Sequence, residues 1–291
     1  MWLLFSYDRM NTAMIRKQYP YGSLWISPTS IADFDKCPRL YFLHNVYKNP
    51  KTGKKIQVTN PHMTLGLTVH NVLGTISKLP KNKRFEIPLA TIFENEWSQY
   101  LGKRGGFRDT EEEAEFKQKG IDMLLRLEKN PGILTHFANK ISEKIPSMLL
   151  SQKDNIILCG VVDWIEVLLD GSLHIIDFKT GKKNDEESSL QLAVYMLLVA
   201  AYLKRSVSKM SYWYLAHDDG LVEAEIPDVE SVTKFLIEKG QRIKEAKSQA
   251  KLSCTKGGCR YCEKFEKVTH GEGEYVGPSS HDRELYFVTN D

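Results

Sequence analysis

Two apolar segments joined by a short turn constrain the fold of this chain more than any other feature. The first segment spans 156–162, the second spans 173–179, and Asp170-Gly171 lies between them. The β-branched residues in the first run favour a strand, and the second run is apolar up to its last residues. We therefore predict a β-hairpin at the centre of the fold.

Charged side chains end these apolar segments. Asp163 follows the first, and Asp177 and Lys179 end the second. Side chains alternate along a strand, so Asp177 and Lys179 share one face while Phe178 points into the opposite layer. Two carboxylates brought together can hold a hard cation such as Mg²⁺, and the ammonium can orient or deprotonate an attacking water. The alternative is a solvated ion pair at an exposed strand end, which contributes little to stability. Charged groups beside an apolar run cost free energy, which favours a functional role for them.

The register of the hairpin decides whether the carboxylates can share a metal ion. A two-residue loop would place Asp163 opposite Phe178, on the wrong face, and would leave Asp163 as a surface residue. A three-residue loop over 169–171, with Gly171 in the left-handed conformation, would place Asp163 opposite Asp177. A single bulge elsewhere in the ladder would restore the same parity. We predict one of these two arrangements.

The remaining sequence predicts an α/β fold in which helices flank a small mixed sheet. Ser27 followed by Pro28 starts a helix that runs to about Lys36. A third strand is expected over 209–216, and 271–291 is expected to be a loosely ordered C-terminal tail. The other predicted helices are a short one ending before Asn49-Pro50, one at 61–76, a helical insertion at 78–150, and helices at 190–203 and 233–249.

Composition places the chain in a reducing, membrane-free environment. Its 40 basic and 37 acidic residues leave a formal net charge of +3, so any basic footprint must be local. No apolar run approaches the ~20 residues needed to span a bilayer, and the N-terminus does not resemble a signal peptide. We expect a soluble cytoplasmic protein. Three of its five cysteines lie within 254–262, which favours metal ligation over disulfides.

The order and spacing of several short motifs resemble the RecB-like nucleases of the PD-(D/E)XK superfamily, which include CRISPR-associated exonucleases. The resemblance spans most of the chain and implies a restriction-endonuclease-like core at 25–270, preceded by an N-terminal extension at 1–24. The motifs that carry it are Cys37-Pro38 with Tyr41, Gly66 with His70, Gly160 with Asp163, Asp177-Phe178-Lys179, Gln191 with Tyr195, and the C-terminal cysteines.

The resemblance implies a role for each motif. His70, Asp163, Asp177 and the carbonyl of Phe178 would bind Mg²⁺ or Mn²⁺, and Lys179 would be the catalytic lysine. Gln191 and Tyr195 would support the site and contact the substrate strand. Taken alone, His70 reads as an ordinary core or surface histidine, and Gln191 and Tyr195 read as hydrogen-bonding residues on a buried helix.

The cysteines imply a second metal site in the segment 250–265. In the family, one early and three late cysteines hold a [4Fe-4S] cluster, and Cys37, Cys254, Cys259 and Cys262 would supply these ligands. The spacing departs from the family pattern, because the extra cysteine precedes the close pair and Val268 occupies the later position. A four-thiolate zinc site, or no metal, is the alternative. Cys159 is expected to be a buried core residue.

The function implied is metal-dependent hydrolysis of DNA by an exonuclease on single-stranded ends in DNA repair or recombination. The alternatives are DNA trimming for CRISPR spacer acquisition, or a non-cleaving DNA-binding subunit of a repair complex. No G-x4-G-K-[ST] motif occurs, so unwinding would need a partner helicase. Three basic patches are candidate contacts to single-stranded DNA: Lys48, Lys51, Lys54 and Lys55; Lys81, Lys83 and Arg84; and Lys103, Arg104 and Arg108 beside Phe107.

Overall fold

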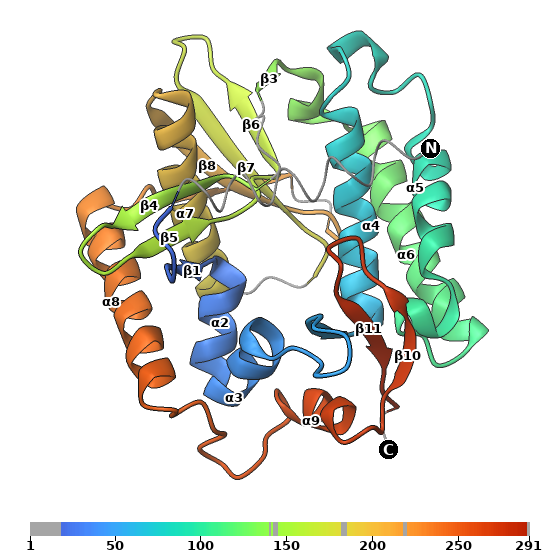
Figure 1. Cartoon of the computed structure of the whole chain (residues 1–291). Coiled ribbons are helices and arrows are strands. Elements are labelled where there is room, and N and C mark those ends of the chain that lie inside the picture. The colour runs from blue at the N-terminus through green and yellow to red at the C-terminus, as the bar shows by residue number, and fades with distance from the viewer. Residues whose placement is uncertain (1–18, 140, 142–144, 182–184, 218–219, 290–291) are drawn as a thin grey trace.

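A computed structural model describes residues 19–139, 141, 145–181, 185–217 and 220–289 (Figure 1). A central five-stranded sheet has the order β3-β6-β7-β8-β9. β7 and β8 are parallel, and the other neighbours in this sheet are antiparallel. The strands are β3 (Ala138–Asn139), β6 (Trp164–Val167), β7 (Leu173–Lys179), β8 (Val207–Tyr214) and β9 (Leu221–Ala224).

Helix α7 (Asp185–Leu203) connects the parallel strands β7 and β8, as a crossover connection requires. Its apolar residues, among them Leu192 and Val194, pack into a core shared with Ile175 of β7 and Ile156 of a second sheet. That second sheet has the order β1-β5-β4, with strands β1 (Leu24–Ile26), β5 (Ile156–Cys159) and β4 (Ser147–Ser151). Helix α8 (Val229–Ser248) packs against the same core through Leu236 and Ile243.

A second core covers the other face of the central sheet. Ile176 and Phe178 of β7 and Trp213 of β8 pack there against three helices. These helices are α4 (Pro61–Ile76), α5 (Leu89–Trp97) and α6 (Thr110–Lys129). The alternation along β7 therefore sends Ile175 and Phe178 into different cores, as the sequence predicts.

A third sheet and the early helices bring the two ends of the described chain together. Its strands are β2 (Ile56–Val58), β11 (Glu284–Phe287) and β10 (Glu274–Pro278), in the order β10-β11-β2. The early helices are α2 (Pro28–Lys36), α3 (Pro38–Tyr41) and the π-helix η1 (Phe42–Val46), and α9 (Glu263–Thr269) lies beside them (Figure 1). Short 3-10 turns occupy Lys81–Lys83, Ser98–Tyr100, Gly102–Gly105 and Gly132–Thr135.

Local sequence signals located several element boundaries correctly. Helix α2 begins at Pro28, and Ser27 and Ser30 form a reciprocal capping box, with Ser30 N donating to Ser27 Oγ at 3.2 Å. Helix α4 begins at Pro61 after the cap residue Asn60. Strand β7 has the predicted bounds, 173–179.

The hairpin has the predicted three-residue loop. Trp164 pairs with Ile176 and Val167 pairs with Leu173, and Gly171 has a φ of +85°. Leu168 N donates to Ser172 O at 2.9 Å, which leaves residues 169–171 as the loop. Continued by one residue beyond β6, this register places Asp163 opposite Asp177.

Two predictions from local composition are wrong. The stretch 78–148 is not wholly helical, because β3 and β4 occupy 138–139 and 147–151. The C-terminal residues are not loosely ordered, because β10 and β11 form a hairpin whose β11 pairs in parallel with β2. β3 and β11 pair with β6 and β2, which lie far away in the sequence, and local composition does not indicate such pairing. β4 instead pairs with the adjacent β5 across the turn at 152–155. Among the described helices, none is long and apolar enough to cross a membrane.

Candidate active site and cysteine cluster

Three elements bring the predicted catalytic residues together at one end of the central sheet. Asp177 and Lys179 end β7, Asp163 immediately precedes β6, and His70 lies on α4. The Nδ1 atom of His70 is 3.1 Å from Asp163 Oδ1, and the backbone N–H of Phe178 donates to Asp163 Oδ2 at 3.1 Å. Lys179 Nζ is 2.7 Å from Asp177 Oδ2. Asp163 therefore connects His70 to the end of β7.

The two buried carboxylates have opposite pKa shifts because their hydrogen-bond partners differ. Asp177 is 0% exposed, and burial raises its pKa to about 7, with the charge of Asp163 adding to the rise and Lys179 opposing it. Burial also acts to raise the pKa of Asp163, but His70 and the Phe178 N–H stabilise that carboxylate and hold its pKa below the ordinary value. Burial opposes charge on His70 too, yet Asp163 raises the pKa of this imidazole.

One oxygen of the Asp177 carboxylate lacks a binding partner in the described residues. This oxygen, Oδ1, is buried and accepts no hydrogen bond from them. A buried oxygen of this kind costs free energy unless another group binds it. Hard divalent cations prefer carboxylate and carbonyl oxygens, so the donors present at Asp163 and Asp177 fit Mg²⁺ or Mn²⁺.

Lys179 is held between the sheet and α7. Its Nζ donates to Gln191 Oε1 at 2.6 Å, and Gln191 Nε2 donates to Tyr195 Oη at 2.7 Å. Gln191 and Tyr195 are one helical turn apart, so both face β7. Burial raises the pKa of Tyr195 well above its ordinary value, so the phenol is neutral and can accept this hydrogen bond.

Two residues beside the site carry no sequence signal of their own. The ring of Tyr212, on β8, lies 5.9 Å from Lys179 Nζ, because the parallel register pairs Asp177 with Tyr212. Thr180 follows Lys179, and its Oγ1 would lie 3.4 Å from a Cβ added at Gly66 of α4. The parallel pairing of β7 with β8, set by the α7 crossover, is the information that could have identified Tyr212.

The four predicted cysteine ligands form a compact group. The sulfur atoms of Cys37, Cys254, Cys259 and Cys262 all lie within 4.8 Å of one another. The sulfurs of Cys259 and Cys262 are 3.6 Å apart. Although burial opposes it, the N–H groups of Cys262 and Tyr261 lower the pKa of Cys259 to about 7, which favours the thiolate that binds metal. Four thiolates suit either an iron-sulfur cluster or zinc.

The fifth cysteine lies apart from this group. Cys159 is half-buried on β5, and its thiol donates to the carbonyl of Ile26 at 3.4 Å. Burial raises the pKa of Cys159 to about 11, so the thiol stays protonated and unreactive at neutral pH.

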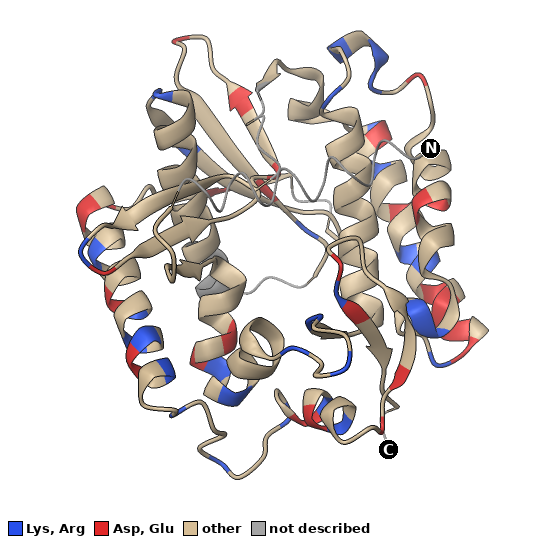
Figure 2. Ribbon diagram, viewed as in Figure 1, with Lys and Arg blue, Asp and Glu red and all other residues tan. Residues whose placement is uncertain are grey.

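Most of the predicted basic patches have structural roles. Phe107 is 1% exposed and packs against Trp97, so the interpretation that it stacks on DNA bases is wrong. Arg84 is buried and donates to the carbonyls of Leu134 and His136 at 2.5 and 2.9 Å. Ion pairs and carbonyl contacts likewise occupy Lys54, Lys103, Arg104 and Arg108. Figure 2 shows cationic and anionic residues interspersed along α6 and α8, rather than in one continuous basic stripe.

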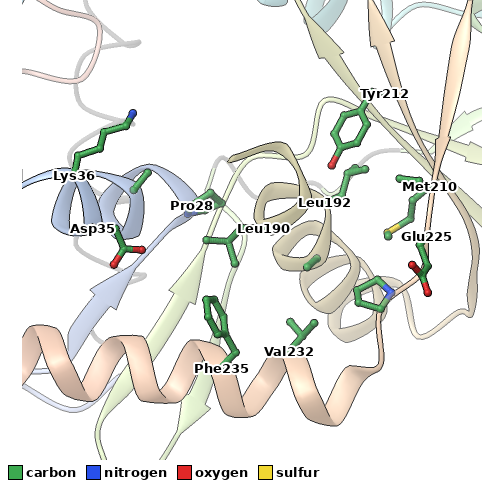
Figure 3. Close-up of a pocket in the computed structure, with 14 residues that line it drawn as sticks. Pro28, Asp35, Lys36, Leu190, Leu192, Met210, Tyr212, Glu225, Val232 and Phe235 are labelled. Carbon is green, nitrogen blue, oxygen red and sulfur yellow. The ribbon is translucent and has the colours of Figure 1, made fainter. Parts of the chain in front are cut away.

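An apolar cavity of about 860 Å³ adjoins the candidate active site (Figure 3). Leu190 and Tyr212 line it from α7 and β8, and Phe235 lines it from α8. Asp35 and Glu225 also contribute to its wall, and Figure 3 shows both carboxylates. Lys36 also lines the cavity, and Asp35 is paired with Lys239 at 2.7 Å. The largely apolar walls do not match a polyanion.

Comparison with protein families identifies the class to which this site belongs. A sequence model of the PD-(D/E)XK nuclease superfamily matches residues 25–264, which include every residue of the two candidate sites. The chain belongs to the PD-(D/E)XK nuclease superfamily. It is therefore a phosphodiester-hydrolysing nuclease by class, and nucleases of this class act on DNA and use divalent metal ions. No curated protein sequence matches the chain.

Proposed function

We propose that this protein is a metal-dependent deoxyribonuclease of RecB-like type that removes nucleotides from single-stranded DNA ends. The observation that carries the proposal is the buried Asp177, whose Oδ1 has no hydrogen bond from the described residues and whose other oxygen contacts Lys179. A buried carboxylate with one unsatisfied oxygen beside the charge of Asp163 is costly for folding alone, whereas a hydrolase needs both groups at the reacting phosphate.

His70, Asp163, Asp177 and the carbonyl of Phe178 would hold Mg²⁺ or Mn²⁺. When bound, the ion supplies Lewis-acid polarisation of the scissile phosphate and lowers the pKa of a coordinated water. The protein's contribution is to order these ligands before substrate arrives. The Phe178 N–H and His70 both fix Asp163, and the rigid sheet fixes Asp177.

Lys179 acts on the attacking water or on the phosphate oxygens. An ammonium has three N–H donors, and its contacts to Asp177 and Gln191 leave at least one available to solvent or substrate. The side chain is 22% exposed, which is enough to meet a phosphate at the surface. Gln191 and Tyr195 position this ammonium and contact the substrate strand.

The finer assignments extend the same proposal. We assign the nuclease domain to 25–270, completed by the β10–β11 hairpin, with a helical insertion that ends before β3. We assign the four cysteines to a [4Fe-4S] cluster, with zinc as the alternative. The intact set Asp163, Asp177 and Lys179 favours cleavage over a non-cleaving repair subunit. Repair or recombination in the cytoplasm is the proposed setting, and CRISPR spacer trimming is the alternative. A helicase would supply unwound ends.

The test is a nuclease assay on end-labelled single-stranded, double-stranded and circular single-stranded DNA with Mg²⁺, Mn²⁺ or EDTA. We expect divalent-dependent release of short products from linear single strands and no cutting of circles. Lys179→Ala should lower the rate by about 10²–10³-fold. Lys247→Ala removes an exposed lysine of α8 and serves as the matched control. Full cleavage by folded Lys179→Ala would contradict the assigned site, and cutting of circles would contradict the exonuclease assignment.

A further inference from the structure

A second cavity, of about 410 Å³, lies where the cysteine segment meets the start of α4. Arg260, Tyr261 and Lys264 come from the cysteine segment and α9, and His62 comes from the first turn of α4. Its volume falls in the range of small-molecule sites, and its walls combine basic and aromatic side chains. This combination differs from the apolar cavity beside Tyr212.

The charges in this cavity are largely uncompensated. Among the described residues, neither Arg260 nor Lys264 forms an ion pair, whereas nearby Arg39 is paired with Glu266 at 2.5 Å. One carboxylate, Glu112, lines the cavity, and Arg108 already contacts it at 3.1 Å. The local charge therefore favours an anion.

The aromatic surfaces of the cavity suit a nucleobase. The Arg260 guanidinium lies over the ring of Tyr261, 4.8 Å from its centroid, and also donates to the Tyr261 hydroxyl at 2.8 Å. His62 and Phe116 also line the cavity, and their rings pack edge-on with centroids 4.9 Å apart. Stacked guanidinium and aromatic planes of this kind bind unpaired bases without sequence preference.

Helix α4 connects the cavity with the candidate active site. His62, Gly66 and His70 are spaced four residues apart and so lie along one side of this 16-residue helix. At ~1.5 Å per residue, His62 is about 12 Å from His70 along the helix axis. That separation corresponds to three or four steps of a stacked strand, at ~3.4 Å each.

We propose that this cavity is a subsite for single-stranded DNA, in which Lys264 and Arg260 bind a backbone phosphate and the Arg260–Tyr261 pair stacks on a base three or four nucleotides from the cleaved bond. The inference rests on the proposed nuclease function for its substrate class. It adds a binding site that the catalytic cluster does not require. Because Arg260 and Tyr261 lie between Cys259 and Cys262, the cysteine group fixes the position of both side chains.

Binding of a fluorescein-labelled 12-nucleotide single strand, measured by fluorescence anisotropy in EDTA, tests the subsite without cleavage. Arg260→Gln/Lys264→Gln should weaken binding about 10-fold and reduce the slope of log K against log salt by about 0.7, as expected when one phosphate is no longer neutralised. Lys251→Gln/Lys256→Gln removes two exposed lysines of the same segment outside the cavity and should bind within twofold of wild type. Equal losses in both double variants, or none in the first, would overturn the proposal.

Photocrosslinking provides a test that needs no variant. Oligonucleotides carrying 5-iodo-deoxyuridine at successive positions should crosslink to peptides containing Tyr261 at positions three or four nucleotides from the cleaved bond, and crosslinks confined to other surfaces would contradict the subsite. Displacement of the strand by millimolar thymidine monophosphate, dependent on Arg260, would instead identify a free-nucleotide site. A preference for the same sequence as RNA would reject DNA as the ligand. Crosslinking at Tyr261 without cleavage would contradict the nuclease proposal but not the subsite. Cleavage without that crosslink would contradict the subsite but not the nuclease proposal.

Discussion

At the scale of single residues, the molecule holds an ionisable carboxyl group where folding alone would not place one. Asp177 is fully buried, and burial raises its pKa to about 7. The charged form is therefore disfavoured relative to an exposed aspartate. This cost is concentrated at the position that the proposed metal chemistry needs, which is a common feature of functional sites.

Asp177→Asn should separate folding from function. The amide removes the charge without changing the size of the side chain, so we expect the metal-free variant to be at least as stable as wild type at pH 8. Divalent-metal affinity should fall at least about 100-fold and cleavage should be lost. Urea unfolding in EDTA and Mn²⁺ titration measure the two effects, and an unfolded variant or unchanged metal affinity would contradict this role.

A buried histidine on β7 makes stability sensitive to acid. His174 is 2% exposed, with its Nδ1 2.8 Å from Glu166 and its Nε2 2.8 Å from Ser211 Oγ. Burial lowers the pKa of His174 below 6.5, although the hydrogen bond to Glu166 opposes the shift. The unfolded chain therefore takes up a proton near pH 6.5 that the folded protein does not, so stability is lost as pH falls below 6.5.

His174→Gln should reduce this acid sensitivity, because glutamine keeps a donor and an acceptor but does not titrate. We expect the wild-type free energy of unfolding to fall between pH 7.5 and pH 5.5, and the variant to lose less over the same interval. Urea denaturation in EDTA at the two pH values measures the difference. An identical pH dependence in both proteins would show that other groups, such as Glu166, control it.

At the scale of elements, the loop of the β6–β7 hairpin sets the geometry of the candidate site. One residue fewer in the loop would shift the register and move Asp163 to the other face of the sheet. The three-residue loop depends on Gly171, whose φ of +85° is strained for any residue with a Cβ. The alignment of two carboxylates thus depends on a glycine that lies at the far end of the hairpin.

Gly171→Ala should destabilise the protein by about 1–2 kcal/mol, because the Cβ of alanine makes the left-handed backbone conformation unfavourable. Gly74→Ala is the matched control, because Gly74 lies inside α4 with open space at its Cβ and should stabilise by about 0.5–1 kcal/mol. Denaturant unfolding measures both. The same sign of change for the two substitutions would contradict the assigned loop conformation.

At the scale of the whole molecule, the cysteine group joins the beginning and end of the nuclease fold. Cys37 lies between α2 and α3, and its three partners lie more than 200 residues later in the chain. The Arg39–Glu266 ion pair and the parallel pairing of β2 with β11 connect the same two regions. Closing so long a loop removes much conformational freedom from the unfolded chain.

Cys37→Ala should release the metal and lower the melting temperature by roughly 5–10 °C, corresponding to about 2–4 kcal/mol. Anaerobically purified wild-type protein should be brown and carry about four iron atoms per chain, as a four-thiolate cluster implies. Cys159→Ala, which removes the cysteine outside the group, should leave the metal content unchanged. Elemental analysis and visible absorbance measure the identity and amount of the bound metal. One zinc per chain would favour the tetrahedral zinc site. An unchanged metal content in Cys37→Ala would exclude Cys37 as a ligand.

The sequence by itself determined the features that depend on short-range physics. Alternation along 173–179 places Asp177 and Lys179 on one face, the Ser27-Pro28 signal starts α2, and Asp170-Gly171 marks the turn of the hairpin. The structure decided between the two registers that the sequence left open. The same local rules could not indicate the partners of β3 and β11, because strand pairing between distant segments depends on burial that composition does not encode.

Only the tertiary structure decided how groups from separate elements meet. It placed His70 beside Asp163 and Tyr212 beside Lys179, and it buried Phe107 and Arg84, which local charge had suggested as contacts to DNA. It also brought Arg260 and His62, about 200 residues apart in the chain, to one cavity. These outcomes depend on how helices pack against both faces of one sheet. Short stretches of neighbouring residues carry no information about that packing.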